Sequence, residues 1–356
     1  MRDREGEAPA TTRKPGDLPE RSPFPGAGRA FGGGSTAAVT VFRRLQWGRA
    51  PPPDITHARR HAGAEPDGGR RRAAGAHAEP DRPRAPCVRS GGWSVTAYPP
   101  RRIVCLTEET VETLYLLGAE DRIVGVTGYA VRPPRVRREK PRVGAFTSAD
   151  LPKILGLAPD LVLTFSDLQA DIAAGLIRAG VAVHAFNQRN VAGILAMIRM
   201  LGALVDVRDR AEALAAGLER DLAAMAADAP AQRPSVWFEE WDAPLISGVG
   251  WVSELIAIAG GHDVFADLGA QPAARDRIVS PEAVVAAAPE VILASWCGKR
   301  VRPEGIAARP GWDGVPAVRA GRIHEIKSPL ILAPGPAALT DGLAAIRGAL
   351  TAGAAS

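Results

Sequence analysis

Aromatic rings next to carboxylate or amide side chains occur where the strand-like apolar runs of this 356-residue chain end. Phe238-Glu239-Glu240-Trp241 shows the pattern most densely, and it recurs at Phe165-Ser166-Asp167, Asn187-Gln188-Arg189 and Trp296-Cys297. Rings stack on flat surfaces, and polar neighbours orient a ligand through hydrogen bonds. These residues therefore favour the binding of a large, flat, partly apolar molecule.

The rings also have a second interpretation. Phe165, Phe186 and Trp237 could each close the hydrophobic core of a sheet instead of facing a ligand. Aromatic residues make up only 5% of the chain, yet many of those beyond residue 97 lie at the ends of strand-like runs in both halves. This recurrence favours a shared ligand surface for the set as a whole.

Beyond residue 97 the sequence shows no spacing typical of a catalytic or metal site. His184, His262 and His324 are isolated, without an HxxxH or His-carboxylate pattern. GxGxxG, P-loop and GxSxG motifs are absent. The three cysteines have no CxxC spacing, which gives no support to a disulfide framework or a zinc site. We expect a binding protein that is not an enzyme and carries no cofactor of its own.

Residues 1–97 differ from the rest in composition. They are rich in Arg, Pro, Gly and Ala and contain 17 Lys/Arg against 10 Asp/Glu, which leaves 27 and 29 for residues 98–356. The basic pI of about 9.4 therefore comes from the first segment, and the sequence does not favour nucleic acid as a partner. We expect residues 1–97 to be a disordered tail, because they cannot bury enough apolar surface to offset chain entropy.

A mis-called start codon would also explain this tail, since GC-rich DNA read upstream of a gene encodes such a composition. We expect the natural protein to begin near Val95, which intact-mass measurement would test. No secretory signal is visible, and Thr36–Phe42 is too short for a signal core. As written, the sequence predicts a cytoplasmic protein.

From residue 102 onward, strand-like and helix-like stretches alternate, which predicts an α/β fold with mostly parallel sheets. Strands are expected at 102–106, 123–126, 161–165, 181–186, 235–239, 291–295 and 322–326. Helices are expected at 108–117, 150–157, 168–179, 190–204, 207–227, 251–259, 280–287 and 337–350. In such folds ligands bind beyond the carboxyl ends of the strands, where the aromatic and polar residues lie.

A duplicated unit divides this fold into two lobes. Ala158-Pro159-Asp160 and Ala288-Pro289-Glu290 each follow a short helix and precede a buried strand. The long helix at 207–227 would join the two copies. We therefore predict an N-terminal lobe at 98–190, a helical connector at 191–230 and a C-terminal lobe at 231–356, with the ligand cleft between the lobes.

Four segments carry a resemblance to a known family. Tyr98–Leu106, Gly128–Pro134, Ala158–Val162 and Pro289–Leu293 resemble the Fe/B12 periplasmic-binding family of ABC-importer substrate-binding proteins. The resemblance covers about Tyr98 to Leu350, and the segment from Phe238 to Trp251 is similar to the cobalamin-binding branch. It implies two parallel-sheet lobes joined by one long helix, with the ligand in the cleft between them.

The resemblance also implies site residues. Tyr129, Phe146 and Phe165 match first-lobe positions where the cobalamin binder presents rings to the corrin. Phe238 matches the corresponding second-lobe position, and Ser328 lies near an acid that the family uses. Glu239, Glu240 and Trp241 have no strict counterpart and would set ligand choice. The full predicted ligand set is Tyr129, Phe146, Phe165, Gln188, Phe238, Glu239, Glu240, Trp241, Trp296 and Ser328.

For the two glutamates an alternative stays open. Glu239, Glu240 and Gln188 could hydrogen-bond the peripheral amides of a corrinoid, which would explain buried carboxylates. Either glutamate could instead pair with a cation across the cleft: Arg189, Arg277 or Lys299.

The resemblance implies an ABC-importer permease as a partner. The family places an acid in the first turn of a matching helix in each lobe to meet the permease. Glu282 fits that position in the second lobe. In the first lobe Pro152 stands there, and Asp150 is the nearby acid.

The main prediction is a monomeric corrinoid-binding protein with cobalamin as the transported ligand, and the family resemblance implies that it is periplasmic. Haem or a ferric siderophore is the alternative ligand within the same family. The alternative enzyme is a tetrapyrrole metal chelatase, which would use His184 or His324 with Glu239.

Overall fold

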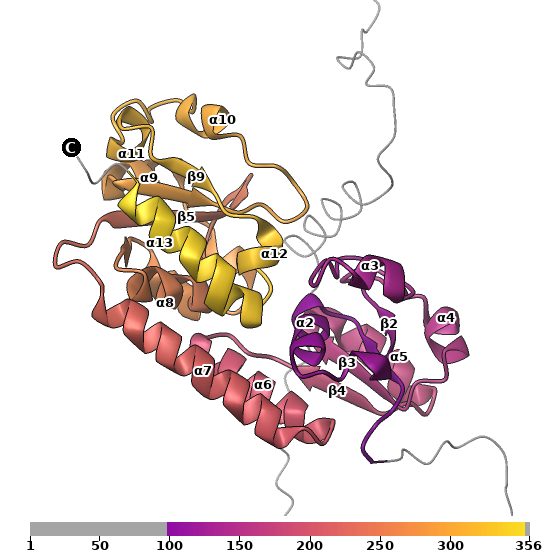
Figure 1. The fold of residues 1–356 in the computed structure, drawn as a ribbon. Helices are drawn as coiled ribbons and strands as arrows, with labels where there is room; N and C mark the ends of the chain where they lie inside the picture. Colours follow the sequence, from indigo (N-terminus) through magenta and orange to yellow (C-terminus); the bar gives the residue numbers. More distant parts are fainter. Residues whose placement is uncertain (1–97, 353–356) are drawn as a thin grey trace, which may run out of the picture.

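A computed structural model of the chain describes residues 98–352, which form two sheet-based lobes (Figure 1). The sheet of the first lobe has the order β2-β1-β3-β4, and every pairing is parallel. The central strands β1 and β3 are apolar except for Thr164 and are buried on both faces, as expected when helices cover a parallel sheet. The strands are β1 (Ile103–Cys105), β2 (Ile123–Val126), β3 (Leu161–Phe165) and β4 (Val183–Phe186).

Short helices surround this first sheet. They are α2 (Glu108–Leu116), α3 (Val136–Glu139), α4 (Leu151–Gly156) and α5 (Ala170–Arg178), with 3-10 turns η1 (Glu120–Arg122) and η2 (Asp167–Gln169). The helix expected at 168–179 thus begins as a 3-10 turn. Ser166 causes this change, because its backbone adopts a φ of 59° and its hydroxyl accepts a hydrogen bond from the Leu168 amide.

Two long antiparallel helices connect the lobes. They are α6 (Val191–Leu204) and α7 (Arg208–Ala227), which pack against each other below both lobes (Figure 1). Asn190 caps α6, as its side chain accepts a hydrogen bond of 2.7 Å from the Gly193 amide. Both helices predicted between 190 and 227 are therefore confirmed.

The second sheet has the order β6-β5-β8-β9, with β7 beside the first residues of β5. Its strands are β5 (Ser235–Asp242), β6 (Leu245–Ser247), β7 (His262–Asp263), β8 (Val291–Ala294) and β9 (Ile323–Glu325). The strand predicted at 235–239 runs three residues further. Its end folds back into the antiparallel strand β6, which the sequence reading did not predict.

The helices of the second lobe are mostly short. They are α8 (Gly250–Ile258), α9 (Pro281–Ala287), α10 (Pro303–Ala307), α11 (Pro316–Arg319), α12 (Ser328–Ile331) and α13 (Leu343–Thr351), with 3-10 turns η3 (Ala266–Ala270) and η4 (Ala274–Arg277). The last predicted helix, 337–350, is interrupted. Its first part, η5 (Ala338–Gly342), is a π-helical turn, and α13 follows.

The Pro-acid repeat takes the same conformation in both lobes. Ala158 and Ala288 each follow a short helix with a left-handed φ of 44°. The acid two residues later then binds the chain that enters the central strand. Asp160 accepts hydrogen bonds from the amides of Arg101 and Arg102, at 2.7 and 2.9 Å. Glu290 accepts one from the amide of Ser235, at 2.8 Å.

One apolar core extends through both lobes. It includes strand residues of the first sheet, the inner faces of α6 and α7, and residues of β5, β8, α8 and α13. A second cluster, centred on Trp237, Ile292 and Trp312, fills the other face of the second sheet. The connecting helices are therefore part of the core, and they fix how the strand ends of the two sheets face each other.

Candidate ligand site between the lobes

The first lobe presents aromatic rings at the ends of its strands. Tyr129 follows β2 and is half-buried, as is Phe146. Phe165 ends β3 and is 6% exposed, with its ring centroid 6.5 Å from that of Phe146. The guanidinium of Arg189 lies over the Phe165 ring at 5.2 Å from its centroid. The structure therefore brings three predicted residues to one side of the cleft, and a cation covers one of the rings.

Gln169 holds this aromatic group in place. Its carboxamide donates to the backbone oxygens of Phe146 (2.7 Å) and Leu106 (3.1 Å), and it accepts from the Phe165 amide at 2.9 Å. The side chain is 1% exposed, so these bonds are shielded from water. The sequence reading missed Gln169, because its partners lie on other strands and loops.

The second lobe contributes Trp296, which borders a cavity of about 670 Å³. The ammonium of Lys299 lies between two rings, 4.8 Å from the centroid of Trp296 and 5.2 Å from that of Trp241. Lys299 also forms an ion pair with Asp242. The other lining residues lie at 298–305 and at Arg309. Trp296 is 6% exposed and every residue that lines this cavity belongs to the second lobe, so its contact with a ligand between the lobes stays a prediction.

Glu239 does not reach the cleft, which corrects its assignment as a ligand contact. Its carboxylate is fully buried and forms a two-pronged ion pair with Arg309, at 2.5 and 2.8 Å. The indole nitrogens of Trp237 and Trp296 donate to the same carboxylate at 3.2 and 3.1 Å. Such a buried acid is stabilised only by this full set of partners. Glu239 therefore fixes the orientation of the Trp296 indole through this hydrogen bond.

Glu240 forms an ion pair, which was the alternative to a role in ligand binding. It pairs with Arg277 through two contacts of 2.7 and 3.0 Å, and both side chains are largely buried. Arg277 also donates to the Ser247 carbonyl. The pairing with Arg277 is as anticipated, but it lies within the second lobe and does not cross the cleft.

Phe238 and Trp241 are also buried. Phe238 is 0% exposed and packs against Gly248, so it cannot stack on a ligand in this structure, contrary to the prediction. Trp241 is 3% exposed and donates from its indole to the Ala243 carbonyl at 3.1 Å. In a strand, alternate side chains point to opposite faces. Both faces of β5 are covered, so its rings enter two different cores.

Gln188 and Ser328 lie where the two lobes meet. The Gln188 carboxamide donates to the Pro334 carbonyl of the second lobe at 2.9 Å. Ser328 begins α12 and is half-buried. Gln188 thus contacts the opposite lobe.

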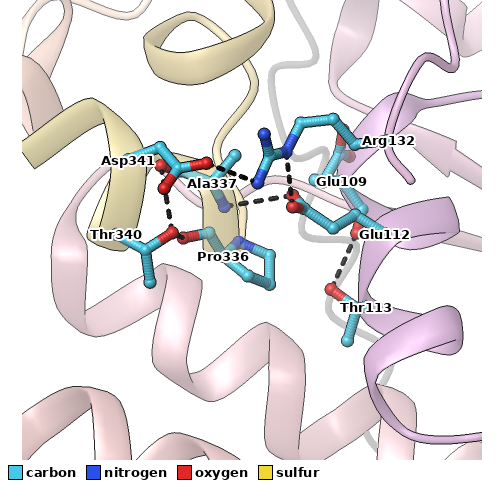
Figure 2. A network of polar contacts seen from close by, with 8 residues as sticks. All are labelled: Glu109, Glu112, Thr113, Arg132, Pro336, Ala337, Thr340 and Asp341. Carbon is cyan, nitrogen blue, oxygen red and sulfur yellow. Dashed lines mark hydrogen bonds and ion pairs between the residues drawn. The ribbon is translucent and has the colours of Figure 1, made fainter. Parts of the chain in front are cut away.

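A polar network joins the lobes beside this point (Figure 2). Arg132 of the first lobe binds Glu112 at 2.7 Å and Asp341 of the second lobe at 2.8 Å. Glu112 also accepts a hydrogen bond of 3.0 Å from the backbone amide of Ala337. The first turns of α2 are therefore tied to the π-helical turn of the opposite lobe.

Two further acids of α2, Glu108 and Glu109, line a small crevice between the lobes. Arg132 of the first lobe and Pro329 and Ala333 of the second line it as well. Desolvation by burial raises the pKa of Glu108 to about 8, with a further contribution from the neighbouring Glu109. Burial likewise raises the pKa of Glu109 to about 7, and the Thr107 hydroxyl partly offsets this effect. Their carboxyl groups are therefore partly protonated near neutral pH.

Cys297 approaches these first-lobe residues from the second lobe. Burial raises the pKa of its thiol to about 12, and the nearby Glu108 and Glu240 raise it further. Burial also raises the pKa of Tyr129, with added effects of Cys297 and Glu108. Cys297 of the second lobe therefore lies close to Tyr129 and Glu108 of the first.

The histidines do not assemble into a metal site. Within residues 98–352 no group of three His, Cys, Asp or Glu side chains could hold a metal ion. His184 and His324 lie on β4 and β9, in different sheets, and burial lowers the pKa of each. Since Glu239 is bound by Arg309, the structure gives no support to the chelatase arrangement.

This geometry agrees with the comparison to known families. The family model described as periplasmic binding protein matches residues 103–330. The chain belongs to this family. Its members are substrate-binding proteins of importers for iron, vitamin B12 and haem, located in the periplasm or attached outside the cytoplasm as lipoproteins. The predicted family and the two-lobed fold are confirmed.

Curated substrate-binding, cobalamin-binding and vitamin B12-binding proteins are similar along most of the described chain. YvrC of Bacillus subtilis, an ABC transporter substrate-binding lipoprotein, is 26% identical over 67% of this chain and 76% of its own length. The vitamin B12-binding protein of Vibrio parahaemolyticus is 25% identical over 68% and 86%. A cobalamin-binding protein of Halobacterium salinarum is 26% identical over 54% of this chain and 53% of its own length. The chain thus spans about half of this last relative.

Solved structures of this family share the fold. The periplasmic haem-binding protein RhuT of Roseiflexus sp. RS-1 superposes with a TM-score of 0.61 at 28% identity, covering 70% of this chain and 99% of RhuT. The vitamin B12-binding protein BtuF of Vibrio cholerae gives a TM-score of 0.58 at 24% identity, covering 71% and 98%. Haem and cobalamin binders are thus similarly close in structure.

Periplasmic binding proteins of this type work with ABC-importer permeases. The two acids predicted to dock lie exposed at equivalent helix starts. Asp150 caps α4 by accepting from the Lys153 amide at 3.0 Å, and Glu282 lies in the first turn of α9. No helix within residues 98–352 is long and apolar enough to cross a membrane. The predicted tail, including Val95, lies outside the described residues.

Proposed function

We propose that this protein is the corrinoid-binding component of an ABC importer and that cobalamin is the ligand held between its lobes. The observation that carries the proposal is the grouping of aromatic side chains at the strand ends of the first lobe. Tyr129, Phe146 and Phe165 lie at the strand ends of the first lobe, and Trp296 lies at the edge of the second. Such rings suit a broad, flat macrocycle.

The named relatives support the corrinoid. Two of them, from Halobacterium salinarum and Vibrio parahaemolyticus, are described as cobalamin-binding or vitamin B12-binding proteins.

Haem is the second candidate, and Tyr129 is the observation that favours it. Its phenol is half-buried at the site and could ligate iron. RhuT, a haem-binding protein, is also 28% identical to this chain. Against this role, burial raises the pKa of the Tyr129 phenol and so disfavours the phenolate that would bind iron.

A direct titration distinguishes these ligands. The full chain is mixed separately with cyanocobalamin, haemin and a ferric siderophore, and binding is followed by tryptophan quenching and calorimetry. Saturable binding of cyanocobalamin at about micromolar Kd or tighter supports the proposal. If haemin alone binds, and Tyr129→Phe removes its absorbance shift, the protein is a haem binder.

We further propose that the protein acts as a monomer outside the cytoplasm and docks on its permease through Asp150 and Glu282. Charge reversal at these exposed positions should leave ligand affinity unchanged while it lowers uptake by cells that depend on this importer. Unchanged uptake would remove both acids from the docking surface. Cell fractionation and light scattering test the location and the monomer.

A further inference from the structure

Arg189 lies where the first lobe meets the second, and its neighbours in the chain bind the second lobe. It follows β4, at the edge of the first sheet where the parallel strands end. The Gln188 carboxamide donates to the Pro334 carbonyl at 2.9 Å. The Val191 amide donates to the Glu254 carboxylate of α8 at 2.7 Å. The backbone of Arg189 is therefore fixed between two contacts with the opposite lobe.

The guanidinium of Arg189, in contrast, is held loosely. Its carboxylate partner is Asp167, which lies 3.6 Å away and has a side chain that is 84% exposed. Its Nε atom donates to the side-chain oxygen of Asn187 at 3.1 Å. Within residues 98–352 the guanidinium makes no other hydrogen bond or ion pair. Because an arginine has five N–H donors, most of those of Arg189 remain available.

Arg277 and Arg132 differ from Arg189, because carboxylates bind them closely. Arg277 makes two contacts with Glu240, at 2.7 and 3.0 Å. Arg132 lies 2.7 and 2.8 Å from two carboxylates, one in each lobe. Such pairs neutralise the cation within the fold. Arg189 is therefore the one of these three arginines that is available to an anion from outside the fold.

The guanidinium also covers an aromatic ring of the predicted site. It lies 5.2 Å from the centroid of the Phe165 ring, a distance at which the ring face attracts a cation. Phe165 is 6% exposed, whereas 29% of the Arg189 side chain is accessible. A ligand beside this ring would therefore contact the guanidinium more than the phenyl group. A guanidinium stacks on flat surfaces and donates paired hydrogen bonds to oxyanions.

We propose that Arg189 determines ligand specificity by donating hydrogen bonds to an oxyanion carried at the edge of the ligand ring. This inference rests on the proposed function, because it requires a ring beside the first-lobe aromatic residues. Cobalamin offers such a group in the phosphodiester of its nucleotide tail, and carboxylates on a ring offer the same chemistry. The oxyanion would replace the distant Asp167 as the partner of Arg189.

Three corrinoids separate these two sources of the oxyanion. Cyanocobalamin carries the phosphodiester, dicyanocobyrinic acid carries carboxylates around the ring, and dicyanocobinamide carries neither. Calorimetry compares the three ligands on the full chain. The wild type should bind at least one of the two anionic corrinoids about tenfold or more tightly than dicyanocobinamide. The anionic corrinoid that gains affinity identifies the source.

Substitutions of Arg189 should remove that preference. In Arg189→Gln we expect the preferred anionic corrinoid to lose about tenfold or more in affinity, while dicyanocobinamide changes by less than about twofold. Arg189→Lys should retain part of the preference, because it keeps the charge but loses the paired donors. Arg178→Gln is the charge-matched control, since Arg178 is exposed on α5 of the same lobe. It should leave all three affinities unchanged.

The outcomes separate this inference from the proposed function. If none of the three corrinoids binds the wild type, the proposed function fails and the inference fails with it. If the wild type binds dicyanocobinamide as tightly as both anionic corrinoids, the inference alone fails, and this result needs no variant. A preference that persists in folded Arg189→Gln, as judged by circular dichroism, also overturns it. Equal losses for all three ligands would show that Arg189 acts only on the shape of the site.

Discussion

The two lobes treat the acids at their strand ends in opposite ways. In the second lobe, Glu239 and Glu240 are buried in two-pronged pairs with Arg309 and Arg277. In the first lobe, Glu108 and Glu109 of α2 form no ion pair within residues 98–352, and burial raises the pKa of each. Paired acids keep their charge inside the fold, whereas the unpaired acids take up protons when they are buried. The comparison therefore distinguishes acids that stabilise the scaffold as ion pairs from acids that make stability depend on pH.

The largest expected effect comes from Arg309. Arg309→Met leaves Glu239 as an uncompensated buried charge. It also loosens the indoles of Trp237 and Trp296, which donate hydrogen bonds to the Glu239 carboxylate. We expect the free energy of unfolding to fall by about 3–5 kcal/mol, measured by urea denaturation. Combining it with Glu239→Leu should recover much of the loss. A decrease below about 1 kcal/mol would show that Glu239 is not held mainly by this pair.

Trp296 connects the buried pair to the site. Trp296→Ala should weaken corrinoid binding by about 1–3 kcal/mol, because it removes a stacking surface at the edge of the second lobe. Phe238→Leu is the matched control, since Phe238 is fully buried and should change ligand affinity little. Calorimetric titration provides both values. Equal losses in the two variants would mean that the rings act only through folding.

The unpaired acids make stability depend on pH. Because burial raises the pKa of Glu108 to about 8 and of Glu109 to about 7, from an ordinary 4.5, the folded protein holds protons that the unfolded chain releases in this range. The free energy of unfolding contributed by these groups should fall as pH rises from about 4.5 to about 8.

The Glu108→Gln, Glu109→Gln double variant should flatten this slope in urea denaturation at a series of pH values. His184 and His324 act in the opposite sense below about pH 6.5, because burial lowers the pKa of each. They are present in both proteins, so the difference between wild type and variant isolates the glutamates. Parallel pH profiles would indicate that both carboxyls stay hydrated.

The smallest effect is expected from the link between Arg132 and Asp341. Both side chains are partly exposed, so a double-mutant cycle with Arg132→Ala and Asp341→Ala should give a coupling of about 0.2–1 kcal/mol. Without ligand, both variants should also exchange their backbone amide hydrogens at η5 faster than the wild type does. A coupling near zero would mean that Glu112 and the packed helices, and not this ion pair, hold the two lobes together.

The sequence predicted what local patterns determine. The Pro-acid repeat and the two connecting helices follow from periodicity and turn chemistry. The roles of Glu239 and Glu112 could not be predicted, because they depend on distant partners. Arg309 lies 70 residues beyond Glu239, and Ala337 lies 225 beyond Glu112. Phe238 was misassigned because a strand pattern does not show that both faces of β5 are covered.

The shared apolar core has a consequence for how the protein unfolds. Because α6, α7 and α13 contribute to one cluster with residues of both sheets, neither lobe can lose its packing without exposing apolar surface of the other. The two lobes should therefore melt as one cooperative unit despite their duplicated design. Calorimetric and van't Hoff enthalpies that agree would confirm it, whereas two separate transitions would reveal independent halves.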